Sequence, residues 1–265
     1  MTRRTAVLST CLMVAGGITQ VRAQAVLLRV TPPVGQATHY RSVTESWMQI
    51  PGMPAGDSTK PTMTQTLFTT RTVTGMDGTA RIITSVVDSS RQDMGAMGGM
   101  GGMGGDMLRG MTTTQHVDPR GNVLSTEVTP PPGAPPMMAQ AMRQGGAVAR
   151  GAAVMPERAV QPGESWTDSM TIPIGAGQQT VFRVTYKLER VERQGGARAA
   201  VVSWQGTVRS DSAATPGAAG TMTGQLALDL DAGRLISSSM EMRVTAETPQ
   251  GAMPIRSKTT MQTLP

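Results

Sequence analysis

The stretch FRVTYKLE, Phe182 to Glu189, alternates apolar and polar side chains at every position. Successive side chains of a β-strand point to opposite faces of its sheet, so this alternation predicts a strand with one buried face and one exposed face. The same period of two recurs at residues 225–230 and 240–245. Strands with one polar face are typical of antiparallel sheets that pack their other face against a core. We therefore expect a mainly β, antiparallel protein.

Turn-forming residues separate the expected strands, and they follow the same order in both halves of the chain. Hairpin turns are expected at Gly78 and residues 118–122 in the first half, and at Gly195 to Gly196 and residues 231–233 in the second. We interpret this shared order as an internal duplication, with evenly spaced turns in any antiparallel chain as the alternative. The expected fold is a set of antiparallel, internally duplicated curved sheets, arranged as a half-barrel or a sandwich, with one short helix between the halves.

Composition divides the chain into four parts, which are a signal peptide at residues 1–25, a first β-rich half at 26–130, a proline-rich linker with a short helix at 131–153, and a second β-rich half at 154–265. A disordered insertion rich in glycine and methionine is expected at residues 93–110 within the first half. The helix is expected at residues 137–144, where Met138 and Met142 lie one turn apart, and Gly145 should end it.

The N-terminal residues have the features of an export signal. Arg3 and Arg4 precede a mostly apolar run at residues 5–18, and the A-x-A pattern that ends at Ala25 follows. The run is shorter than the roughly 20 residues that a membrane-spanning helix needs, and no later segment is closer to that length. We expect cleavage near Ala25, an extracytoplasmic mature chain in the periplasm or the medium, and no transmembrane segment in that chain. Lipidation at Cys11 remains open.

Cleavage would change both the charge and the redox chemistry of the chain. The signal contains the single cysteine, so the mature chain would have neither a disulfide nor a thiolate. It also contains three of the 24 basic residues and none of the 18 acidic ones, which leaves a weakly basic protein. A nucleic-acid-binding protein would show a cluster of basic residues interleaved with stacking aromatics, whereas here arginine and lysine are scattered and aromatics make up only 3% of the chain. We exclude nucleic acid as a partner.

No motif in the sequence predicts an enzyme or a cofactor. Residues 163–167, GESWT, lack the final glycine of a nucleophile elbow. His39 and His116 are single residues in strand-like contexts, and a calcium loop beginning at Asp229 would place Met240 where its bidentate acid is required. We expect no catalytic residues, no cofactor and a non-catalytic protein.

The Gly/Met-rich insertion contains the one candidate metal site. Four methionines recur at every third position and a fifth follows four residues later, namely Met94, Met97, Met100, Met103 and Met107. Thioether sulfur is a soft ligand that prefers Cu(I) or Ag(I). Ordering so many glycines would cost much conformational entropy, and the segment has no cysteine or histidine, so a disordered insertion is the favoured interpretation. Soft-metal binding by these five methionines is the alternative.

The segment MPERAVQPGESW, Met155 to Trp166, precedes a strand with Tyr186 and Leu188 and a later Asp-x-Gly-Arg turn at residues 231–234. These motifs resemble a family of exported bacterial two-repeat, β-rich proteins of unknown function. The resemblance implies two similar β-rich halves and supplies no catalytic residue. The long strands and the small helix also resemble, in architecture alone, the curved half-barrel of periplasmic lipoprotein carriers.

These observations predict an exported binding or carrier protein whose concave sheet face takes up an apolar or lipid-like ligand of unknown identity. A structural or protein-interaction component of the cell envelope, which would bind an envelope protein, is the alternative. Cu(I) or Ag(I) binding by the methionine-rich loop is the third. Trp47, Trp166 and Trp204 are expected to anchor the core of the sheet, and a sugar-binding platform is the other interpretation.

Overall fold

The computed structural model describes residues 24–49, 59–95, 106–146, 153–173, 179–211, 218–248 and 251–265. Within them the chain forms one helix, α1 (Pro136–Gly146), and eleven strands. The strands are β1 (Ala37–Met48), β2 (Met63–Asp77), β3 (Ala80–Asp93), β4 (Thr112–Val117), β5 (Val123–Thr129), β6 (Ser165–Pro173), β7 (Gln179–Gln194), β8 (Ala197–Asp211), β9 (Ala218–Asp229), β10 (Leu235–Thr248) and β11 (Gly251–Thr263).

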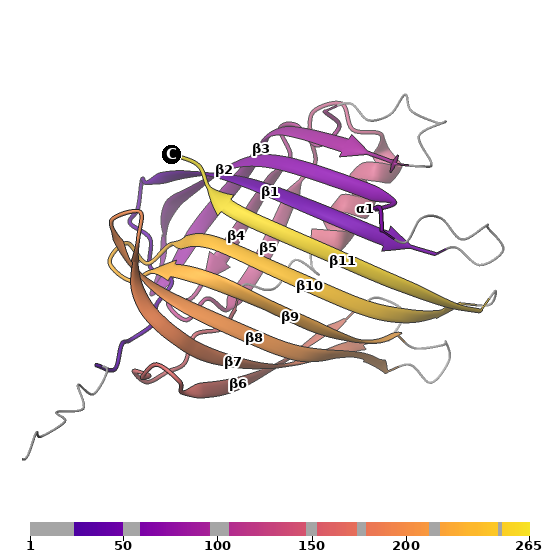
Figure 1. Ribbon diagram of the computed structural model, residues 1–265. Helices are drawn as coiled ribbons and strands as arrows, with labels where there is room; N and C mark the ends of the chain where they lie inside the picture. The colour runs from indigo at the N-terminus through magenta and orange to yellow at the C-terminus, as the bar shows by residue number, and fades with distance from the viewer. Residues whose placement is uncertain are drawn as a thin grey trace, which may run out of the picture.

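All eleven strands belong to one antiparallel sheet in the order β5-β4-β3-β2-β1-β11-β10-β9-β8-β7-β6. The first and last strands of the chain pair at its centre, so each half contributes one side of the sheet. The sheet is strongly curved, and β4, β5 and α1 are seen behind β1 and β11 in Figure 1. The prediction of a mainly β, antiparallel fold with one short helix before the second half is confirmed. Of the two expected arrangements, half-barrel and sandwich, the structure shows a single curved open sheet, and the described residues form no second sheet.

The predicted turns lie where the sequence placed them. The β2–β3 hairpin turns at Gly78 and the β7–β8 hairpin at Gly195 and Gly196, all with positive φ, which favours glycine. The β4–β5 and β9–β10 turns share a device: a carboxylate oxygen of Asp118 or Asp229 accepts two backbone N–H bonds of 2.8 to 3.0 Å from the turn that follows. This parallel agrees with the duplication, which stays a prediction.

One face of the sheet carries the hydrophobic core, and we call it the inner face. It is defined by Tyr40, Val73, Ile83, Tyr186 and Leu188, which are at most 6% exposed. Residues directly opposite in an antiparallel ladder share a face, so the register extends this assignment across all strands. The opposite face is the outer face.

Two segments outside the sheet cross one end of the inner face. Residues 24–36, the first strap, and residues 153–160, the second strap, form a short antiparallel bridge in which the backbones of Val26 and Val160 exchange hydrogen bonds of 2.8 and 2.9 Å. Leu28 and Met155 from the straps are 0% and 2% exposed within the largest core cluster. Burying such a side chain contributes about 1.5 to 3 kcal/mol. The straps therefore close this end of the sheet.

Helix α1 includes all of the expected residues 137–144 and packs against β5. It begins at Pro136, a residue suited to a first helical turn, and it continues through Gly145 rather than ending there. The described residues contain no helix with enough length and apolar character to cross a membrane. Residues 96–105 of the Gly/Met-rich insertion lie outside the description, whereas residues 106–110 form a turn in which Asp106 accepts a hydrogen bond from the Ser90 backbone at 2.6 Å.

Candidate ligand-binding face

The strands place many methionines on the inner face. Met222 on β9 lies directly opposite Met242 on β10, and both belong to the row that crosses β7 at Val184. The set on this face comprises Met48, Met63, Met170, Met222, Met240, Met242, Met253 and Met261. Methionine is flexible and polarisable, so a surface built from it adapts to apolar partners of varied shape.

Aromatic side chains lie next to these methionines, nearer the straps. Trp166 stacks on Tyr186 with ring centroids 5.5 Å apart, and its Nε1 donates a 2.8 Å hydrogen bond to the Val154 carbonyl of the second strap. Trp204 is opposite Tyr186 in the ladder and faces Gly224, where any Cβ atom would overlap the indole ring. Trp47 is on the outer face, with Arg256 over its ring at 4.6 Å. The three tryptophans therefore form no common platform.

The inner face differs between its two sides. On the side made by β1 to β4 most inner-face residues are polar, including Thr38, Ser42, Thr44, Gln65, Thr69, Arg71, Ser85, Gln92, Thr113 and Gln115. On the side made by β6 to β11 most are apolar, including Trp166, Phe182, Val184, Trp204, Val208, Val244 and Ile255 besides the methionines. The inner face is thus amphiphilic, and the boundary follows the β1–β11 junction.

Exposure changes along the inner face. Leu188 and Val202, beneath the straps, are 0% exposed, whereas Met48 at the other end is 40% exposed and Met240 and Met242 are half-buried. Among the described residues outside the sheet, the two straps bury inner-face side chains at one end, and the turn at residues 106–110 contacts Ser90 on β3. The part away from the straps consequently keeps apolar surface that water can reach.

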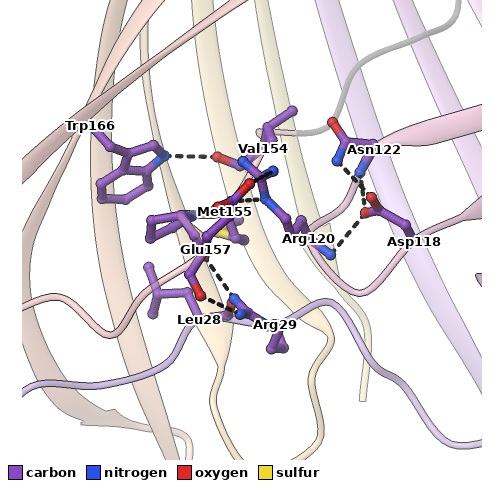
Figure 2. A network of polar contacts seen from close by, with 10 residues as sticks. Leu28, Arg29, Asp118, Arg120, Asn122, Val154, Met155, Glu157 and Trp166 are labelled. Atoms are coloured by element: carbon purple, nitrogen blue, oxygen red, sulfur yellow. Dashed lines mark hydrogen bonds and ion pairs between the residues drawn. The ribbon is translucent and has the colours of Figure 1, made fainter. Parts of the chain in front are cut away.

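A polar network holds the straps and joins the two edges of the sheet (Figure 2). Arg120, in the β4–β5 turn, donates from Nε to the Met155 carbonyl at 2.8 Å, and the Met155 N–H donates to the Arg120 carbonyl at 2.7 Å. Arg29 of the first strap donates to the carbonyls of Pro156 and Glu157 at 2.8 and 2.7 Å. The Arg120–Glu157 ion pair adds little to stability, because the Glu157 carboxylate is 82% exposed to water. The hydrogen bonds from Arg29 and Arg120 to backbone carbonyls therefore hold the second strap in place.

A hollow of about 800 Å³ crosses strands β6 to β9. Most of its lining side chains alternate with the inner-face rows and so belong to the outer face, namely Thr167, Ser169, Arg183, Thr185, Gln205, Thr207, Thr221 and Thr223. These groups are mainly hydroxyls exposed to water. Its side chains offer mainly hydroxyl groups rather than the large aliphatic and aromatic groups that line most sites for apolar ligands.

The structure places two of the five candidate metal ligands, and the other three, Met97, Met100 and Met103, lie outside the described residues. Met94 is 40% exposed and Met107 39%. Gln92 Nε2 lies 3.2 Å from the Met94 sulfur and 3.1 Å from that of Met63. Met63, far from Met94 in sequence, was missed because β2–β3 pairing alone brings it there. Metal binding stays a prediction.

The described residues contain no group of three or more histidine, cysteine, aspartate or glutamate side chains that could hold a metal ion. His39 contacts Thr70 at 2.9 Å, and His116 contacts Asp77 at 3.1 Å. β2 and β3 separate the strands that carry the two histidines, so the pair does not meet.

No protein-family model matches the chain, and no curated protein matches it. Among solved structures, the chain is similar to the crystal structure of the hypothetical lipoprotein YmcC from Escherichia coli (K12). The match has 12% sequence identity and covers 85% of this chain and 87% of that one, with a TM-score of 0.27. A score this low carries no conclusion about ligand or activity.

Tyr186 gives the aromatic cluster a measurable pH dependence. Burial raises the pKa of Tyr186 to about 12, and the charge of Asp168 also raises it, while a hydrogen bond with the Val154 backbone lowers it. The unfolded chain should release this proton near pH 10. Stability from this group is therefore complete below about pH 10 and is lost as the pH rises toward about 12.

We expect the free energy of unfolding to fall by about 1.4 kcal/mol per pH unit from this residue across that window. Urea denaturation at several pH values would measure the slope, and Tyr186→Phe should make it shallower. An identical slope in the variant would show that Tyr186 titrates as it does in the unfolded chain.

Proposed function

We propose that this protein is an extracytoplasmic, non-catalytic binding or carrier protein that holds an apolar or lipid-like ligand against the inner face of its sheet. The main support for this proposal is the partly exposed surface of methionine and aromatic side chains on β6 to β11, which the straps cover at one end only. Removing apolar surface from water contributes about 25 cal/mol per Å². A ligand that covers this surface would supply the missing second layer of the core.

Four charged side chains with several short hydrogen bonds serve the scaffold. Asp118 and Asp229 hold turns, and Arg29 and Arg120 hold the straps. This use of charged side chains suits a rigid support for a binding face. Export is inferred from the sequence, because residues 1–23 lie outside the description.

The proposal is tested by binding of an apolar fluorophore, N-phenyl-1-naphthylamine, to the purified mature chain. Met242→Gln should weaken binding about tenfold, because the amide would lose water without gaining a partner. The matched control is Met76→Gln, whose side chain is 45% exposed near the β2–β3 turn and should leave affinity unchanged. Absence of fluorophore binding by the wild-type chain would refute the proposal.

Native mass spectrometry of the chain isolated from its own cell envelope distinguishes the alternatives. A copurifying apolar adduct supports the carrier, and a complex with another protein supports an envelope-interaction component. The Met63 and Met94 sulfurs both accept a hydrogen bond from the Gln92 amide and so lie near each other, which keeps soft-metal binding as a further candidate that would appear as a bound copper or silver ion.

A further inference from the structure

Arg71 places a positive charge on the inner face. It lies on β2, opposite Thr38 of β1 and Ser85 of β3. Its guanidinium carbon is 5.3 Å from the centroid of the Tyr40 ring, and its Nε donates a 3.3 Å hydrogen bond to Ser85 Oγ. The ring and the hydroxyl fix the direction of the guanidinium group, so the position is preorganised.

Arg71 forms no ion pair with any described residue. Arg234, the neighbouring cation, does have a partner, because it lies 3.7 Å from the buried Asp229 carboxylate. Burial raises the pKa of Tyr40, and the charges of Arg71 and Arg234 both lower it, which places the two cations near one phenol. With Arg234 paired, the local excess of positive charge comes from Arg71.

Arg71 is half-buried and has no carboxylate partner among the described residues, and the planar set of donors on its guanidinium matches a carboxylate or phosphate group. Its position is also informative. Arg71 lies in the polar side of the inner face, and β11, where the apolar side begins, is two strands away, or about 10 Å across the sheet. The first inner-face methionine of β11, Met261, is opposite Ser42, four residues along β1 from the Arg71 partner Thr38, which adds about 13 Å along the strands and remains within reach of a long-chain amphiphile. One amphiphilic molecule can therefore contact the cation and the methionines together.

We propose that Arg71 binds the anionic head group of an amphiphile, a carboxylate or phosphate, whose apolar chain lies on the methionine-lined side of the inner face. This inference rests on the proposed function and names its ligand class. The head group replaces the missing carboxylate partner of Arg71, and the chain covers the exposed apolar rows. Charge at one position then selects acidic amphiphiles over neutral ones.

The test compares dodecanoate with dodecanol, which share an apolar chain and differ in head-group charge, by displacement of N-phenyl-1-naphthylamine. The wild-type chain should bind dodecanoate more tightly, and Arg71→Gln should weaken dodecanoate about 10- to 100-fold while dodecanol changes less than about twofold. The dodecanoate affinity of Arg71→Lys should lie between those of the wild type and Arg71→Gln, since lysine keeps the charge without the planar geometry. Acetate and inorganic phosphate without a chain should not displace the fluorophore.

Arg41→Gln is the matched control, because it removes the same charge from an exposed position on the outer face of β1. Equal losses in the Arg41 and Arg71 variants would reduce the effect to net charge and overturn the inference. Equal binding of dodecanoate and dodecanol by the wild-type chain would also overturn it, without relying on any variant, and would leave the proposed function standing. Binding of neither compound would refute the proposed function and the inference with it.

Discussion

Leu28→Ala is expected to lower the free energy of unfolding by about 2 to 5 kcal/mol. Leu28 is 0% exposed and belongs to the cluster formed by the straps and the inner-face residues Leu188 and Leu226. Alanine would remove most of its apolar contacts and leave a cavity between strap and sheet. Since Arg29 next to it holds the second strap, the loss should also loosen the crossing of the two straps. Urea denaturation followed by circular dichroism would measure the change.

The neighbouring residue provides the control for this prediction. Leu27 is 52% exposed, so Leu27→Ala deletes the same atoms from a site in contact with water and should shift stability by less than about 0.5 kcal/mol. Equal effects of the two substitutions would mean that the first strap is not part of the cooperatively folded core.

Gly224→Ala is expected to destabilise the protein by about 1 to 3 kcal/mol, although it adds a single methyl group. A Cβ at this position would overlap the Trp204 ring and the Ser239 carbonyl, and neither is the free end of a flexible chain. The indole would have to move away from β9, which should also change the tryptophan fluorescence of the folded state. Chemical denaturation and emission spectra would test both effects.

Gly75→Ala is the matched substitution on another strand. Its new Cβ would meet only the Ile82 Cδ1 atom, at 3.7 Å, which is ordinary contact. Alanine there should leave stability nearly unchanged or raise it slightly, because it restricts the unfolded chain. If both glycines tolerated alanine equally, close packing of Trp204 against β9 would not be a feature of the folded protein.

Much of the strand pattern could be predicted because it is local. The alternation in Phe182 to Glu189 appears in β7, where Tyr186 and Leu188 are buried and Lys187 is exposed. The helix before the second half was expected for the same kind of reason, and the observed helix extends one residue further at its start and two at its end. The methionine rows could be read in part, since Met240 and Met242 alternate with polar residues.

Arg71 could not have been found from sequence. β2 has threonine on both faces, and its register against β3 shifts between Phe68 and Thr69 and again between Val73 and Gly75. The first shift skips Asp88 on β3 and the second skips Thr74 beyond Arg71, so β2 itself alternates regularly up to Val73. Because threonines stand on both of its faces, the sequence of β2 does not show which face is buried. Sequence patterns show neither the shift nor the Tyr40 ring on which Arg71 is held.

The sequence by itself determined the strands, the turns and the presence of one polar and one apolar face, because backbone geometry and side-chain alternation act over a few residues. Only the tertiary structure decided that β1 pairs with β11, that the straps close one end, and that polar and apolar sides meet within one inner face. These arrangements join residues far apart in sequence, as in the hydrogen bond between the Thr44 and Thr259 hydroxyls, which are 215 positions apart. Such contacts arise from burial and pairing over the whole sheet, for which no local pattern exists.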